Sequence, residues 1–306
     1  MVEVDSDSPV QITVPGLIRL QSLAAGLQLK PARVRAAEGG DYLSARKGRG
    51  MEYSESRPYA VGDDIRNLDW RVMARSGKPH TKLFREERER PVLFWVDFRA
   101  AMFFATRGCY KSVLAARLAS LFAWSVSAHS DRVGGLLFSD RVHHEFKPRR
   151  GKRGVLQMIR ALVDQHRLPR QRVDDSLVLA RALLRLRRVV KPGSLVFLLS
   201  DFRGMDDSAR AQLLQISRRA EVVILFVYDP LERDLPAGGR YRVSDGEHER
   251  ILDTADQKLL QAHHRQFEQR LETMRQLAAH CGARFIEAGT ASALTSIAQQ
   301  VQLYRN

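Results

Sequence analysis

The pattern of hydrophobic and polar positions changes at Pro91. From there, short apolar runs alternate with longer stretches in which apolar residues recur at helical spacing. The runs at 91–97 and within 191–201 are continuously apolar, as is typical of central strands that are covered on both faces. The alternation predicts an α/β fold with a doubly wound, mainly parallel sheet and helices on both of its faces.

The same pattern predicts the other elements of this domain, which we place at residues 91–306. The dipeptide Asp245-Gly246, between two extended runs, indicates a hairpin inserted near residues 240–252. The remaining strands are expected at 132–138, 142–146, 221–229 and 283–288, and the helices at 110–129, 152–165, 176–190, 207–219, 256–280 and 291–303.

Residues 1–90 follow a different pattern. A helix is expected near residues 14–28, followed by the Gly- and Arg-rich connector ARKGRGMEY and a polar, β-rich stretch. This part of the chain is too short and too polar to bury a sizeable core of its own. We therefore expect an N-terminal extension that packs on the α/β domain.

The charge of the chain is strongly basic and unevenly spread. The 306 residues carry a formal net charge of +15, and residues 141–191 alone contain fifteen basic and four acidic side chains. A surface of this kind attracts nucleic acid, anionic lipid or an acidic protein, and charge alone does not select among them. We define the basic face by its densest cluster, Arg149, Arg150, Lys152 and Arg153.

Several protein classes are disfavoured by what the sequence lacks. No stretch approaches the ~18 uninterrupted apolar residues of a membrane-spanning helix, and the first ten residues are acidic, unlike a signal peptide. We therefore expect a cytoplasmic chain without a membrane span. Cys109 and Cys281 lack metal-ligand spacing, and no GxxxxGK[ST], GxSxG or HExxH motif occurs. ATP hydrolysis by the chain itself is accordingly not expected.

Two aspartates, Asp97 and Asp201, each end an apolar strand. The carboxyl ends of parallel strands meet at the rim where α/β proteins bind ligands, so both side chains are expected there. The von Willebrand factor A fold builds a metal-ion-dependent adhesion site at this rim from an Asp-x-Ser-x-Ser pattern and a later Asp. Here Arg99 and Ala101 stand where that pattern has its serines.

This departure predicts a degenerate adhesion site. Serine hydroxyls are ligands that magnesium accepts, whereas a guanidinium places positive charge where the cation would sit. We expect Arg99 to pair with Asp97 or Asp201 in place of a metal ion. Magnesium held by Asp97 and Asp201 stays as the alternative, and no other cofactor is expected.

The stretch RPYAVGDDIRNLDWRVMAR, residues 57–75, crowds arginines and aspartates ahead of the first sheet strand. Together with ERERPVLFWVDF, DRVGGLLFSD, LLSDF and YDPLERDLPAGG, it resembles the family called domain of unknown function 58, over about residues 40–290. The residues that match the family pattern are Arg57, Tyr59, Gly62, Asp63, Asp64, Arg66, Asp69, Trp70, Ala74 and Arg75.

The resemblance implies a von Willebrand factor A-like domain that works with a MoxR-type AAA+ ATPase, commonly encoded beside it, in assembling or activating a client protein. We therefore expect a non-enzymatic interaction module, an adaptor, with that ATPase and a client that the sequence does not name as partners. Binding of nucleic acid or another polyanion through residues 141–191 is the alternative function. A metal-dependent hydrolase is a third, which the missing serines disfavour.

The family motif is interpreted as a polar lock that fixes the N-terminal segment. Gly62 permits a tight turn, and Asp63 and Asp64 are placed to cap the backbone that follows. The motif's arginines are expected to clamp its aspartates, Asp69 among them, and Trp70 to bury its ring on the sheet domain. A partner-binding surface and catalysis by the clustered carboxylates are the alternatives.

Overall fold

The computed structural model describes residues 8–27, 51–86, 90–128, 131–168, 177–244 and 249–303. The chain divides into two compact units. The α/β unit comprises residues 1–32 and 90–306, and the small unit comprises Arg33–Glu89. Each unit is described by itself.

The α/β unit is built on a six-stranded sheet with the order β10-β7-β6-β3-β4-β5. All neighbouring strands pair in parallel except β4 and β5, which are antiparallel. The predicted α/β fold with a mainly parallel sheet is thus confirmed. The strands are β3 (Pro91–Asp97), β4 (Arg132–Phe138), β5 (His143–Arg150), β6 (Ser194–Ser200), β7 (Ala220–Tyr228) and β10 (Arg284–Gly289).

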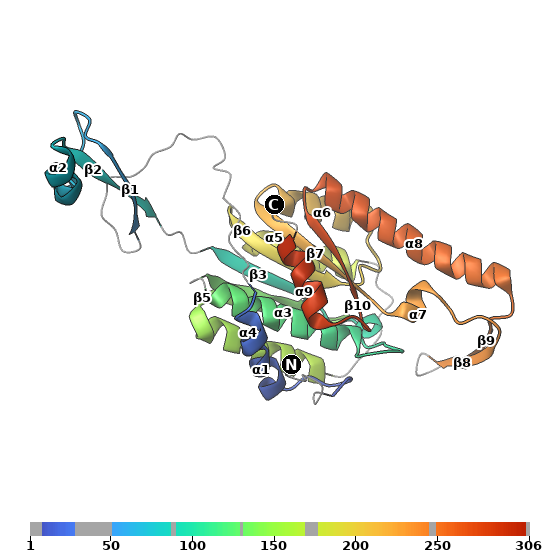
Figure 1. Ribbon diagram of the computed structural model, residues 1–306. Helices are drawn as coiled ribbons and strands as arrows, with labels where there is room; N and C mark the ends of the chain where they lie inside the picture. Colours follow the sequence, from blue (N-terminus) through green and yellow to red (C-terminus); the bar gives the residue numbers. More distant parts are fainter. Residues whose placement is uncertain are drawn as a thin grey trace. The chain divides into compact units, whose positions relative to one another are not determined.

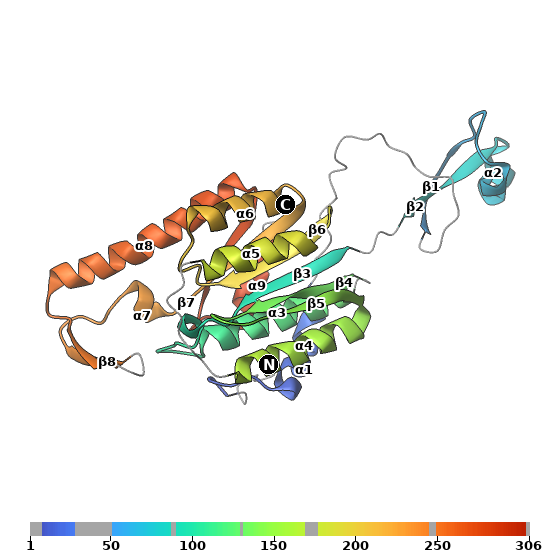
Figure 2. The same cartoon turned by 180° about the vertical axis from the view of Figure 1, so that it is seen from behind.

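Helices cover both faces of this sheet (Figures 1 and 2). Side chains of β3 alternate between the two cores: Phe94 stacks on Phe197 at 5.1 Å, while Trp95 contacts Phe138 at 4.3 Å on the other face. One face carries α1 (Val14–Ala24), α3 (Lys111–Ser127), α4 (Gly151–Arg167) and α9 (Leu294–Leu303); the other carries α5 (Val178–Val189), α6 (Asp207–Ser217) and α8 (Gln257–His280).

Helix α1 belongs to the α/β unit. Leu17 and Leu20 are buried in the same core as α3, and Trp124 Nε1 donates a hydrogen bond to the Leu17 carbonyl oxygen at 3.1 Å. The single extension predicted for residues 1–90 is therefore divided, because its helix packs in the α/β unit and Arg33–Glu89 form a unit of their own.

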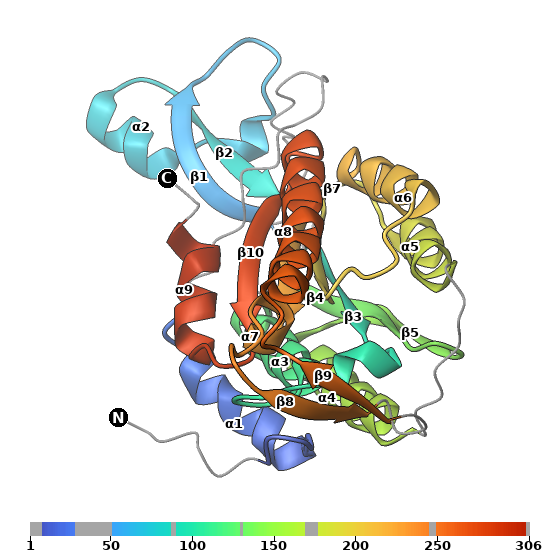
Figure 3. The same ribbon diagram turned by 90° about the vertical axis from the view of Figure 1, so that its right-hand side faces the viewer.

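The predicted hairpin is present as β8 (Arg240–Ser244) and β9 (Glu249–Asp253), which pair antiparallel ahead of α8 (Figure 3). Its expected turn, Asp245-Gly246, lies outside the described residues. A short helix, α7 (Pro230–Arg233), follows β7 and was not predicted.

The small unit consists of an antiparallel pair with short helical elements between its strands. Strands β1 (Met51–Pro58) and β2 (His80–Glu86) pair with an irregularity between Tyr53 and Glu55. Between them lie the 3₁₀ turn Ile65–Asn67 and helix α2 (Trp70–Ser76), which ends at Gly77 with a φ of 66°. Most of the predicted Gly- and Arg-rich connector lies outside the described residues.

Candidate functional site: a rim of paired charges

The carboxyl ends of β3, β6 and β7 bring together a network of buried charges. Lys111, the first residue of α3, places its Nζ 2.9 Å from Asp201 Oδ2 and 2.7 Å from Glu232 Oε1. The side chains of Lys111 and Asp201 are completely buried, and that of Glu232 is 6% exposed. Buried charges persist only when they are paired and hydrogen-bonded, so these groups depend on one another.

Arg99 supplies a second cation to the same rim. Its Nε and Nη2 lie 3.0 Å and 2.7 Å from Asp97 Oδ2, and Nη2 also approaches Asp201 Oδ1 at 3.4 Å. The Arg99 Nη1 group donates to the Arg203 carbonyl oxygen at 2.8 Å. The ion pair that the sequence predicted for Arg99 is therefore formed, with Asp97 as the principal partner. Asp97 and Asp201 do meet at one rim.

The backbone beyond β6 is fixed in an unusual conformation. Phe202, which follows Asp201, has a φ of 52°, in the left-handed region that side chains other than glycine rarely adopt. Its amide donates to Ser200 Oγ at 2.9 Å, and that hydroxyl donates to Asp97 Oδ2 at 2.6 Å. Strain of this kind is kept where the surroundings hold it, and it concentrates at functional sites.

The charge network alters the acidity of its carboxyl groups. Burial alone would raise the pKa of Asp201, but Lys111 and Arg99 outweigh burial and hold that pKa well below its ordinary value. Burial raises the pKa of Asp140, although its Oδ2 accepts a hydrogen bond from the Ala100 amide at 2.7 Å. Asp201 therefore stays ionised well below the pH at which an ordinary aspartate is protonated.

A second group of contacts joins the loops beyond β3, β7 and β10. Asp229 accepts hydrogen bonds from the Thr106 hydroxyl at 2.6 Å and from the Thr290 hydroxyl at 2.7 Å. Burial alone would raise the pKa of Asp229, but these hydrogen bonds lower it. Gly108 allows the loops to approach, because a Cβ there would lie 2.0 Å from the Thr290 carbonyl oxygen. These contacts thus fix the loops on the side of the rim near β10 as well.

These donors do not fit a magnesium ion. The buried carboxylates of Asp97 and Asp201 already face cationic side chains, Asp97 through Arg99 and Asp201 through Lys111. Ala101 has no side-chain oxygen to offer, and the described part of the chain contains no group of three or more His, Cys, Asp or Glu residues that could hold a metal. A hard cation needs several oxygen ligands, whereas the available oxygens lie against ammonium and guanidinium groups.

In the small unit, the family motif holds its own turn. Asp63 accepts from the Ala60 amide at 2.9 Å and pairs with Arg57 at 2.6 Å, and these bonds hold its pKa below the ordinary value. Gly62 has a φ of 107°, so the predicted tight turn is present. Asp64 caps the backbone by accepting from the Arg66 amide at 2.9 Å. Tyr59 continues the strand pair through its amide, which donates to the Pro79 carbonyl oxygen at 2.9 Å.

Asp69 caps helix α2, whereas the sequence predicted an arginine clamp on it. It accepts hydrogen bonds from the Arg71 and Val72 amides at 3.2 Å and 3.3 Å and from the Ser56 hydroxyl at 2.7 Å. The Ser56 hydrogen bond is the main reason that the pKa of Asp69 is lowered. Asp69 therefore fixes the start of α2 to strand β1.

Other parts of the predicted lock differ from the expectation. Trp70 is 60% exposed, so its ring is not buried as predicted. Arg66 and Arg75 are exposed, and within the described ranges neither forms an ion pair. Of Arg57, Arg66 and Arg75, only Arg57 therefore forms the expected ion pair with a described aspartate.

The basic face lies at the opposite end of the sheet from the rim. Arg150 is paired with Arg132, the first residue of β4, whereas the rim lies beyond the last residues of β3 and β4. Arg149, Arg150, Lys152 and Arg153 are all exposed, at the end of β5 and the start of α4. The two candidate surfaces are thus separated by the length of the strands.

Sequence reasoning missed three charged residues of the rim. Lys111 begins an otherwise apolar helix and was not singled out. Glu232 lies three residues after Asp229 in a helix-capping arrangement, Asp-x-x-Glu, which was a readable signal inside a segment taken as loop. Arg203 bonds Glu232 at 2.7 Å, and nothing in the sequence indicated this contact.

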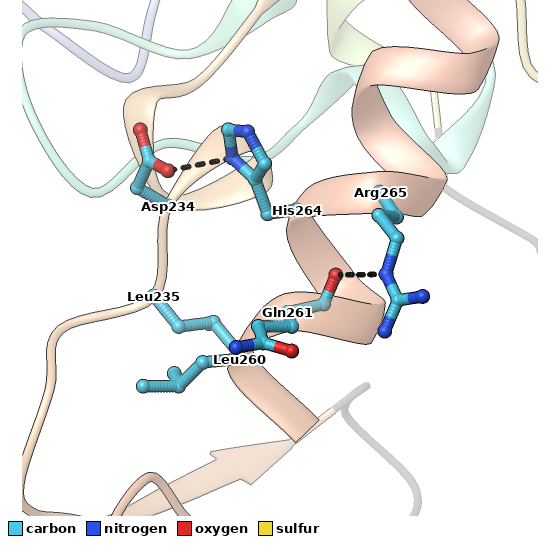
Figure 4. A pocket seen from close by; sticks show the side chains of 6 residues that line it. All are labelled: Asp234, Leu235, Leu260, Gln261, His264 and Arg265. Carbon is cyan, nitrogen blue, oxygen red and sulfur yellow. Dashed lines mark hydrogen bonds and ion pairs between the residues drawn. The ribbon is translucent and has the colours of Figure 1, made fainter. Parts of the chain in front are cut away.

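A separate open hollow of about 570 Å³ lies between the segment after α7 and the first half of α8 (Figure 4). His264 Nδ1 lies 2.8 Å from Asp234 Oδ1 at its edge, and Leu235 and Leu260 form an apolar side. The His264 and Asp234 side chains are 48% and 67% exposed, so water screens the pair. We assign no chemistry to this hollow.

The chain belongs to the family described as protein of unknown function DUF58, whose model matches residues 55–276. This confirms the resemblance seen in the sequence. Similar relatives are the uncharacterized protein Rv1480 of Mycobacterium tuberculosis and the uncharacterized protein Mb1516 of Mycobacterium bovis. Each is 31% identical over 251 residues, which span 79% of this chain and 78% of the relative.

Among solved structures, the chain is similar to the conserved hypothetical protein BatB of Bacteroides thetaiotaomicron, with 14% identity and a TM-score of 0.43 over 70% of this chain and 98% of that chain. An aerotolerance-related membrane protein of Bacteroides fragilis gives the same identity and TM-score over 70% and 99%. An uncharacterized membrane spanning protein of Vibrio fischeri gives 16% and 0.23 over 72% and 99%.

The expected cytoplasmic location is corrected by these descriptions. Two of the three solved structures are described as membrane proteins, so a cytoplasmic location is withdrawn and none is assigned. The expected partners, which were given with no membrane span, are corrected on the same ground, and no partner is shown. Within the described ranges, no helix has the length and apolar character needed to cross a bilayer.

Proposed function

We propose that the chain is a non-enzymatic protein-interaction module, an adaptor, whose von Willebrand factor A-like sheet presents the rim around Asp97, Arg99 and Asp201 to a protein partner. The observation that carries this proposal is the pairing of Lys111 with Asp201 and Glu232. Carboxylates that could serve as metal ligands, acids or bases are already compensated by cations of the chain. A rim of this kind is suited to recognition rather than to catalysis.

The position of the rim supports the same function. The rim lies at the carboxyl ends of the parallel strands, where α/β proteins bind their ligands. Buried ion pairs and the strained Phe202 fix its shape before a partner arrives, and preorganisation of this kind strengthens association. Arg203, with its side chain 47% exposed, brings one of these charges to the surface.

The function is tested by hydrogen–deuterium exchange with an AAA+ ATPase of the MoxR type as the probe, because the sequence resemblance implies this class. The segments that follow β3, β6 and β7 should exchange more slowly in the complex. Residues 149–153, on the basic face, should be unchanged. Failure to form a complex, or protection confined to the basic face, contradicts the proposal.

A further inference from the structure

Arg270 extends the rim onto helix α8. Its guanidinium carbon lies 5.6 Å from the centre of the Phe226 ring and 5.4 Å from that of Phe267. Such stacking holds the planar group in one orientation. Phe226 in turn lies 6.3 Å from the ring of Phe202, the strained residue that follows Asp201. Arg270 is therefore fixed on the aromatic cluster beside the rim.

The Arg270 side chain lacks the partners that the other rim cations have. Its Nε is buried and has no hydrogen-bond acceptor within the described ranges. No ion pair joins Arg270 to a described residue, whereas Arg99 and Lys111 each contact buried carboxylates. An unpaired guanidinium in a half-buried position costs free energy, and an incoming acceptor that reaches the exposed part of the side chain recovers some of it.

The charges around Arg270 also favour an anion. Burial is the main cause that lowers the pKa of Arg270; the positive charge of Arg203 lowers it further, while Asp201 and Glu232 each raise it by less. Arg203 itself is 47% exposed and is bound on one side to Glu232. The positive charge of Arg203 thus disfavours the charge of Arg270. A single negative charge between them relieves this repulsion.

We propose that Arg203 and Arg270 form a receptor for a carboxylate side chain from an acidic segment of the protein partner. The planar guanidinium groups match the two oxygens of a carboxylate, and the half-buried Arg270 side chain forms no ion pair with a described residue that would compete for them. The inference rests on the proposed function, since it names the chemistry by which the same rim recognises its partner.

The direct test is a titration of the wild-type chain, labelled with ¹⁵N in its arginine side chains, with a hexaglutamate peptide. The Nε–H resonance of Arg270 should shift with saturation. In parallel, Arg270→Gln should weaken peptide binding at least fivefold, and Arg270→Lys, which keeps the charge but loses the planar fork, should weaken it comparably. The affinity for the peptide should change less than twofold when Arg149, Arg150, Lys152 and Arg153 are neutralised together.

The inference is overturned by an Arg270 resonance that does not move, or by a larger loss of binding in the basic-face variant than in Arg270→Gln. Inorganic phosphate serves as a second probe, and equal displacement of the peptide by phosphate at matched charge overturns the preference for carboxylate. The wild-type titration does not depend on how well a variant folds. Peptide binding without ATPase binding refutes the adaptor function, whereas ATPase protection of the rim without peptide binding refutes only this inference.

Discussion

Lys111 and Asp201 form an ion pair that is closed off from solvent: Nζ lies 2.9 Å from Oδ2, and neither side chain is exposed. The same ammonium group contacts Glu232 Oε1 at 2.7 Å. Since the ammonium group belongs to the chain, the charge balance of the rim does not depend on a dissociable ion. This relationship accounts for the rim's lack of a free donor set for a metal ion.

Replacing Lys111 with Met should strongly destabilise the α/β unit. The substitution keeps most of the side-chain volume but leaves Asp201 and Glu232 without their buried cation. Breaking a buried pair from one side costs about 3–5 kcal/mol of unfolding free energy. Urea denaturation measures the loss, and Lys258→Met, at an exposed position of α8, is the matched control that should cost under about 0.5 kcal/mol.

A double-mutant cycle separates the energy of the Lys111–Asp201 ion pair from the other effects of the two substitutions. Lys111→Met combined with Asp201→Asn should cost clearly less than the sum of the two single changes, because the second change removes the uncompensated charge left by the first. Additive costs would show that the two groups are not coupled, contrary to the geometry.

The unfolding free energy should fall in acid because of Asp201. Its pKa is lowered in the folded chain, so it stabilises the fold above the ordinary aspartate pKa of about 4 and loses this contribution as the pH falls below it. Urea denaturation between pH 7 and pH 3 measures the slope. Asp201→Asn should flatten the part of the slope below pH 4, and an unchanged slope would show that this carboxyl is not the responsible group.

Magnesium should bind the rim weakly or not at all. The oxygens of Asp97 and Asp201 face Arg99 and Lys111, and Ala101 supplies no ligand. Calorimetry should detect no dissociation constant below about 100 μM, a value within reach of ordinary protein sites for hard cations. A tighter constant that disappears in Asp97→Ala would contradict the assignment of the rim as a site of protein cations.

The two tryptophans Trp70 and Trp95 should respond very differently to truncation. Trp70 is 60% exposed and Trp95 is fully buried. Trp95→Ala should cost about 3–5 kcal/mol, as is usual for buried aromatic residues, and Trp70→Ala less than about 1 kcal/mol. Guanidinium denaturation compares them, and a large cost at Trp70 would restore the polar-lock interpretation in which its ring is buried.

Much of the α/β unit could be predicted from periodicity. Continuous apolar runs locate strands such as β3 and β6, because both faces of these strands are buried and almost any polar residue would be excluded. Helix α8 was expected at 256–280 and is found at Gln257–His280, since its apolar residues recur at helical spacing over six turns. The small unit was harder to predict, because none of its apolar side chains whose burial is described lies in a core.

The rim was only half predictable. The sequence indicates Asp97 and Asp201 because each of them ends an apolar strand. It indicates Arg99 because this residue lies two positions after Asp97. Lys111 gave no such signal, because a lysine at the start of a helix is most often solvated and only the fold brings it to Asp201, ninety residues away. The unpaired state of Arg270 likewise depends on contacts between segments that are distant in the sequence.

The affinity of the chain for the AAA+ ATPase, measured with charge-reversed variants, tests the central claim most directly. Arg203→Glu should weaken binding at least tenfold, about 1.4 kcal/mol, because its exposed guanidinium belongs to the rim. Arg99→Glu would disturb the fold as well, since this side chain is only 12% exposed. Neutralising Arg149, Arg150, Lys152 and Arg153 together should have a smaller effect than Arg203→Glu. The reverse ranking, with submicromolar binding of RNA or DNA at ~150 mM salt, would contradict the account and identify the basic face as the functional surface.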